Sequence, residues 1–169
     1  KEIPVLVHHE LNAKPQTGGG KNQLYVKYCI EQAERYNKRV ILFGDDSNRK
    51  YADEWYDTSH FFSEKWNRFL NVFENMSYYP LSWAKSFFKR FYIFEQWMQE
   101  NDIEECIILD SDVLVYRNFS DGLFDDYDLA LEIEKDQSMF VIEEKNDLRW
   151  VAVAGVAYFT FEALNDFTS

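Results

Sequence analysis

The sequence predicts an α/β domain with a mostly parallel sheet flanked by helices. The chain opens with an apolar run, an amphipathic stretch and a second apolar run, and later a long helical stretch leads into another apolar run. A strand–helix–strand unit places its two strands parallel, with a right-handed crossover. The length of 169 residues suits one domain, which we expect to span residues 1–169.

The opening unit consists of two expected strands and one expected helix. Residues 3–7 are a short apolar run, as in a buried strand. Over residues 22–36 apolar side chains recur every three or four positions, which predicts an amphipathic helix. Residues 39–43 predict a second buried strand, and the polar residues 44–48 indicate a turn. Because ligands of such sheets bind beyond the carboxyl ends of the strands, we expect the functional site there.

The remaining elements follow less regular patterns. Residues 51–79 are aromatic and irregular, and we expect a strand at residues 56–62. Helical periodicity returns over residues 81–99, and residues 106–109 form an apolar run that is typical of a central parallel strand. Two more strands and a helix that the chain end cuts short are expected at residues 129–131, 151–161 and 162–167. We therefore expect the chain to be the amino-terminal part of a longer protein.

Charge and composition narrow the function classes. The formal net charge is −12, and so acidic a surface repels a phosphate backbone, which argues against nucleic acid as a partner. It also repels an anionic membrane, so we expect peripheral membrane contact only through residues outside this chain. No apolar run approaches the roughly 20 residues of a membrane helix, and we expect a cytoplasmic protein. Cys29 and Cys106 lie in apolar segments and are predicted to be reduced core thiols.

Two carboxylates follow the apolar run of residues 106–109. Asp110 and Asp112 are separated by one residue and flanked by apolar segments. Like charges this close destabilise one another in a low-dielectric setting unless a cation compensates them. Oxygen ligands suit Mg²⁺ or Mn²⁺, which take further oxygens from water and substrate phosphates. The pattern predicts a metal site, and the alternative is an exposed turn, since Asp and Ser favour turns.

Four segments resemble a known family. Residues 107–116 are similar to the DxD region of GT-A nucleotide-sugar glycosyltransferases, most of all bacterial ones that decorate surface polysaccharides. Residues 87–91 resemble the helix before that region, which often carries a basic residue facing the donor, and residues 97–103 lead into the DxD strand as they do there. Residues 153–159 are similar to a segment of a small residue, Gly and an apolar strand near donor and acceptor. The resemblance implies the Rossmann-like GT-A fold.

The resemblance also implies roles for single residues. Asp112 would ligate the metal, and Asp110 would contact the metal or the nucleotide ribose. Asp45 and Asp46, after the second expected strand, would lie near the nucleobase and ribose. Further donor-binding positions are implied in the preceding helix, in the DxD segment and in the small-residue segment, namely Arg90, Ser111 and Gly155.

For other polar residues the sequence leaves alternatives open. His9 either forms a hydrogen bond with the nucleobase or lies in a plain loop, and it makes a poor metal pair with His8, because strand neighbours point oppositely. Arg90 either binds a diphosphate or pairs with an acidic side chain. One of three acids after residues 129–131 would be the base that activates an acceptor hydroxyl, namely Glu132, Glu134 or Asp136.

The expected function is that of a metal-dependent, hexosyltransferase-type glycosyltransferase of polysaccharide biosynthesis. It would move a sugar from a nucleotide-diphosphate donor to a glycan or lipid-linked acceptor, with Mn²⁺ or Mg²⁺ as cofactor. Two alternatives remain. A haloacid-dehalogenase-like phosphatase also places DxD after an apolar strand, with the first Asp as nucleophile. A non-enzymatic carbohydrate-binding module would account for the aromatic residues, which make up 18% of the chain.

Overall fold

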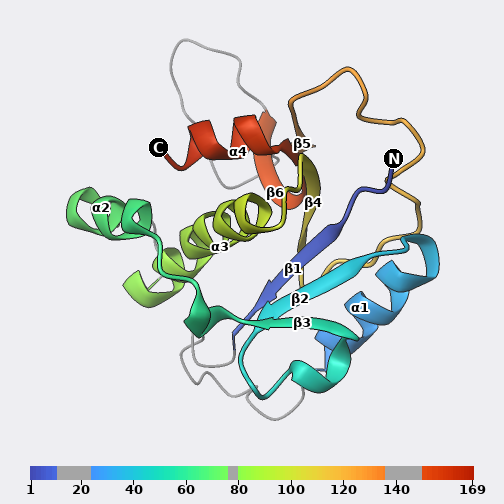
Figure 1. Ribbon diagram of the computed structural model, residues 1–169, viewed down its shortest axis with the longest axis horizontal. Helices are drawn as coiled ribbons and strands as arrows, with labels where there is room; N and C mark the ends of the chain where they lie inside the picture. Colours follow the sequence, from blue (N-terminus) through green and yellow to red (C-terminus); the bar gives the residue numbers. More distant parts are fainter. Residues whose placement is uncertain (11–23, 76–79, 136–149) are drawn as a thin grey trace.

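The strands of the described chain form one sheet in the order β3-β2-β1-β4-β6-β5 (Figure 1). The computed structural model describes residues 1–10, 24–75, 80–135 and 150–169, and only the backbone of residues 132–135 and 150–154. The strands are β1 Val5–His9, β2 Val40–Gly44, β3 Glu54–Asp57, β4 Glu105–Asp110, β5 Leu129–Lys135 and β6 Trp150–Thr160. The α/β class predicted from the sequence is confirmed.

The sheet is mixed, so the expectation of a mostly parallel sheet is only partly right. β1 pairs in parallel with β2 and β4, and β2 pairs in parallel with β3. β6 runs antiparallel to both β4 and β5. A parallel neighbour needs a long crossover, usually a helix. Between β4 and β6 the described residues 111–135 contain a turn segment and strand β5 and no helix, and β6 pairs antiparallel with both of its neighbours.

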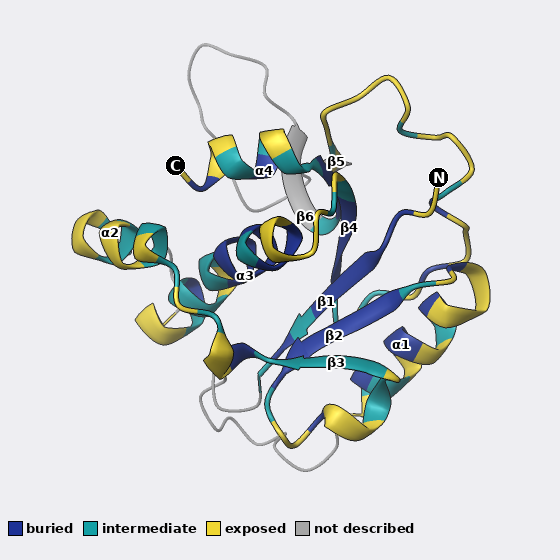
Figure 2. Cartoon of the chain, in the orientation of Figure 1, coloured by how far each residue is buried: buried dark blue, intermediate teal, exposed yellow. Residues whose placement is uncertain are grey.

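Helices cover both faces of the sheet. α1 Leu24–Tyr36 lies on one face, and α3 Leu81–Glu100 and α4 Phe161–Phe167 lie on the other (Figure 1). Because both faces are covered, the central strands are buried on each side and read as continuous apolar runs (Figure 2).

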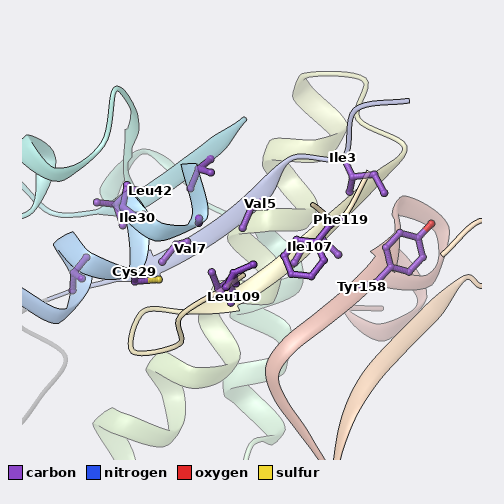
Figure 3. Close-up of a cluster of buried hydrophobic side chains, with 14 residues drawn as sticks. Ile3, Val5, Val7, Cys29, Ile30, Leu42, Ile107, Leu109, Phe119 and Tyr158 are labelled. Atoms are coloured by element: carbon purple, nitrogen blue, oxygen red, sulfur yellow. The ribbon is translucent and has the colours of Figure 1, made fainter. Parts of the chain in front are cut away.

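Alternation along the strands divides the core into two clusters. Val5 and Val7 of β1 pack with Cys29 and Ile30 of α1, on the face shown in Figure 3. Leu6, between the two valines, points to the opposite face, where the helices α3 and α4 supply the cluster. Cys29 and Cys106 are free and buried, as predicted.

The aromatic stretch of the middle of the chain forms a helix that the sequence did not predict. α2 Glu64–Val72 begins after Ser63, whose hydroxyl accepts a hydrogen bond from the backbone N–H of Trp66. Trp66 and Phe69 pack against Tyr92 of α3, with ring centroids 5.3 and 5.6 Å apart. The ion pair between Lys65 and Glu95, 3.2 Å long, adds a polar contact to the same helix pair.

Several boundaries differ from the prediction. The strand expected at residues 56–62 is β3 Glu54–Asp57, and a 3₁₀ turn follows at Thr58–His60 because the Asp57 carboxylate accepts a hydrogen bond from Ser59 N. β1 extends through His9, so both histidines lie in the strand rather than in a loop. In the described ranges of the chain, no helix is long and apolar enough to span a membrane.

Candidate functional site

The candidate site lies where the carboxyl ends of β1 and β4 meet. From β1 the chain proceeds to β2 and β3 on one side, and β4 lies on the other side. This reversal of strand order is the topological switch point at which open α/β sheets bind ligands. His8 of β1 and Asp110 of β4 are register partners across it. The sequence placed the DxD pair after a buried strand, and the structure adds that the end of β1 is its neighbour.

His8 and His9 point to opposite faces of the sheet. His9 lies on the side of α1, with Nδ1 3.1 Å from the Ser111 hydroxyl and its ring edge-on to Tyr25 at 5.5 Å. His8 lies on the side of α3, with Nε2 3.5 Å from Oε1 of Glu10. The alternation expected for strand neighbours is thus observed. His9 is brought to the DxD turn through Ser111.

The DxD segment forms a turn at the end of β4. The backbone N–H of Val113 donates to the carbonyl of Asp110 at 3.1 Å, which closes the turn. The side chain of Asp112 is exposed, and that of Asp110 is 33% exposed. The turn and the metal site, which the sequence left as alternatives, are therefore compatible, since both carboxylates of the turn are accessible to solvent.

Arg90 of α3 forms an ion pair with Asp110. Its side chain is only 6% exposed, and its guanidinium carbon lies 4.4 Å from the ring centroid of Phe87 and 5.0 Å from that of Phe91. This corrects the charge argument made from the sequence. Arg90 supplies a cation for Asp110, and Asp112 faces water, so electrostatic repulsion alone does not require a metal.

Glu10 is a site residue that the sequence did not single out. Its carboxylate lies 2.9 Å from the Lys89 ammonium of α3. Burial by itself would raise the pKa of Glu10, but hydrogen bonds from His8, Thr58 and Lys89 outweigh burial and hold this pKa well below its usual value. Burial lowers the pKa of His8. The available signal was spacing, because His8 and Glu10 are two residues apart at a strand end and so share a face.

Asp45 and Asp46 follow β2, one strand away from the DxD turn. The Asp45 carboxylate accepts a hydrogen bond from Ser47 N at 2.9 Å, so it shapes the turn, while Asp46 is exposed. The buried Asn48 lies beneath this turn and was also not predicted. It donates to the carbonyl of His9 and accepts from the indole of Trp55 at 3.1 Å, which ties the ends of β1 and β2 to β3.

The later candidates lie on the antiparallel strands. Gly155 of β6 is half-buried and immediately precedes Val156, the register partner of Leu109, which places it beside the Asp110 end of β4. Glu132 and Glu134 belong to β5, and Glu132 is the register partner of Val153 beyond a bulge. Their side chains and the whole of Asp136 lie outside the described residues.

The chemistry of the DxD turn fits a divalent cation that prefers oxygen. Asp110 and Asp112 offer carboxylates, and Ser111 between them offers a hydroxyl. Mg²⁺ and its close analogues are commonly bound by one or two carboxylates plus substrate phosphates and water. Among the described residues, no cluster of three or more His, Cys, Asp or Glu side chains is placed to hold a metal. No family model matches the chain, and no curated protein matches it either.

Proposed function

We propose that this chain is the nucleotide-sugar-binding part of a metal-dependent glycosyltransferase of the GT-A kind. The observation that carries the proposal is the position of Asp110 and Asp112. They occupy one turn at the carboxyl end of a central parallel strand, at the switch point of the sheet, and both are accessible. This is where an α/β sheet binds its ligand, and two carboxylates are the donors by which a protein holds Mg²⁺ or Mn²⁺ against a diphosphate.

Different side chains of the site would bind the metal, the diphosphate and the ribose or sugar. Asp110 and Asp112 would hold the metal, which when bound supplies positive charge to the diphosphate leaving group. Arg90 and Lys89 bring further positive charge to the same edge of the sheet. His9 and Ser111 form a polar pair on the α1 side; His9 is buried, so the Ser111 hydroxyl would be the group that bonds a ribose or sugar hydroxyl, and His9 would orient it.

The finer assignments belong to the same proposal. Asp45 and Asp46 border the nucleobase side, and Gly155 leaves room for the donor beside Asp110. The base for the acceptor hydroxyl is one of Glu132, Glu134 and Asp136. The transferred group is a hexose, the acceptor is a glycan or lipid-linked glycan of polysaccharide biosynthesis, and the reaction takes place in the cytoplasm.

Thermal-shift measurements with uridine and guanosine diphosphates, in Mn²⁺ and in EDTA, test the proposal. Ligand that binds only the native state raises the melting temperature, so one of the two nucleotides should give a larger shift in Mn²⁺ than in EDTA. Asp112→Asn should abolish the difference. Asp126→Asn, at an exposed carboxylate outside the site, is the matched control and should retain it. Equal shifts in Mn²⁺ and EDTA would reject the metal assignment.

Two further readouts separate the alternatives. Mg²⁺-dependent hydrolysis of p-nitrophenyl phosphate that is lost in Asp110→Asn would indicate a phosphatase with Asp110 as nucleophile. Binding of glycans without metal or nucleotide would indicate a carbohydrate-binding module. Hydrolysis or transfer from a nucleotide sugar in Mn²⁺ supports the glycosyltransferase.

A further inference from the structure

The ion pair between Arg90 and Asp110 involves the Asp110 carboxylate, which is one of the two proposed metal ligands. Arg90 lies in the middle of α3 and reaches across to the end of β4, 20 residues further along the chain. Its guanidinium is almost fully buried and packs on the rings of Phe87 and Phe91. The guanidinium therefore lies between two aromatic rings and Asp110, and the carboxylate that it contacts is a proposed metal ligand.

Two positive groups compete for one carboxylate in this arrangement. The ion pair engages Oδ1 of Asp110, so a divalent cation bound by the same carboxylate would lie close to the guanidinium, and the two like charges repel one another at short range. A diphosphate changes the balance, because its oxygens accept bidentate hydrogen bonds from a guanidinium. Lys89, the neighbour of Arg90, is paired with Glu10, so of these two basic residues it is Arg90 that contacts Asp110.

We propose that Arg90 makes metal binding at Asp110 depend on the diphosphate. Without a diphosphate, Arg90 holds Asp110 and opposes the metal. With a diphosphate, Arg90 pairs with phosphate oxygens and Asp110 is released to the metal. This inference rests on the proposed function, because it takes Asp110 as a metal ligand.

Titration calorimetry with Mn²⁺ alone is the first test. Arg90→Gln should bind Mn²⁺ about fivefold more tightly than the natural chain, the factor that corresponds to losing a competing ion pair of about 1 kcal/mol. Arg90→Lys keeps the charge and should stay close to the natural affinity. Arg68→Gln is the matched control, since Arg68 is exposed on α2 and forms no ion pair within the described part of the chain. Unchanged or weaker Mn²⁺ binding in Arg90→Gln would overturn the proposal.

Inorganic pyrophosphate without metal is the second probe. Arg90→Gln should lose about tenfold in pyrophosphate affinity, and Arg90→Lys should lose less because it lacks only the fork geometry. A purely structural role for Arg90 would lower stability without producing the opposite changes in Mn²⁺ and pyrophosphate binding. Equal pyrophosphate affinity in the natural chain, Arg90→Gln and Arg90→Lys would refute the proposal that Arg90 pairs with phosphate oxygens.

If near-ultraviolet circular dichroism shows that Arg90→Gln does not fold, Phe87→Leu tests the role of Arg90 instead. Phe87 is partly exposed and contacts the guanidinium, so Leu should loosen Arg90 and increase Mn²⁺ affinity by a smaller factor. No change in Phe87→Leu would then count against the proposal. Absence of Mn²⁺ binding in every chain, with pyrophosphate present or absent, would overturn the proposed function as well, whereas equal Mn²⁺ binding in every chain would overturn only the role of Arg90.

Discussion

Glu10 and Lys89 form an ion pair, 2.9 Å from Oε1 to Nζ, that joins the end of β1 to the first half of α3. The next residue of α3, Arg90, pairs with Asp110 at the end of β4. Two consecutive basic residues of one helix thus bind carboxylates on two adjacent strands, on either side of the switch point. The position of α3 over the candidate site therefore depends on the carboxylates of Glu10 and Asp110, which become protonated in acid.

Acid should destabilise the fold through Glu10. Its pKa in the folded chain lies below the usual value of 4.5, so the unfolded chain binds the proton more readily. The stabilisation is present above pH 4.5 and is lost as the pH falls towards the folded pKa. Glu10→Gln should cost about 1–3 kcal/mol at neutral pH and weaken the acid dependence. Urea unfolding at several pH values measures both effects.

The control for this prediction is Glu74→Gln, at an exposed acid. It should leave both the stability at neutral pH and the slope below pH 4.5 unchanged. His8 acts in the same direction at higher pH, because burial lowers its pKa and disfavours the charged form. An acid dependence that is the same in Glu10→Gln and in the natural chain would assign the effect to other groups.

The two carboxylates of the DxD turn should differ in their effect on stability. Asp110→Asn leaves the buried guanidinium of Arg90 with a neutral acceptor and should cost about 1–3 kcal/mol in the metal-free chain. Asp112→Asn removes an exposed charge and should change stability by at most about 0.5 kcal/mol. Urea unfolding in EDTA provides the comparison. Equal losses in the two variants would show that the ion pair contributes nothing specific.

Gly44 should tolerate no side chain. A Cβ at this position would lie 2.6 Å from the carbonyl oxygen of His9 and closer still to the amide of Asn48. Gly44→Ala should therefore cost about 1–3 kcal/mol through overpacking. The His9 carbonyl belongs to the neighbouring strand, so the clash with it persists when the Asn48 side chain is shortened. The double variant Gly44→Ala/Asn48→Ala should therefore be less stable than Asn48→Ala alone. Full recovery in the double variant would assign the clash to Asn48 only.

Both thiols should be unreactive in the native chain. Cys29 and Cys106 are free and fully buried. Burial, with a smaller contribution from the charges of Asp112 and Asp110, raises the pKa of Cys29 to about 12, and burial also raises the pKa of Cys106. Ellman's reagent should find neither thiol in buffer and both in denaturant. Rapid reaction of one thiol in the native state would contradict the packing of that side chain.

The local pattern of the sequence determined the elements that carry the candidate site. Apolar runs predicted β1, β2 and β4, and helical periodicity predicted α1 and α3 nearly to their ends. These signals are local, because burial on both faces of a sheet or along one face of a helix appears directly as residue spacing. The position of Asp110 and Asp112 after a buried strand could be read in the same way.

Only the tertiary structure decided which charges meet. Arg90 was a candidate for a diphosphate or for a neighbouring acid, and its pairing with Asp110 depends on how α3 is rotated over β4. The Glu10–Lys89 pair and the antiparallel direction of β6 likewise depend on contacts between segments far apart in the chain. Such contacts arise when elements pack, and residue spacing within one element contains no information about its partner. The sequence could therefore locate the carboxylates of the site, but the cation that holds one of them became visible only when α3 was packed on the sheet.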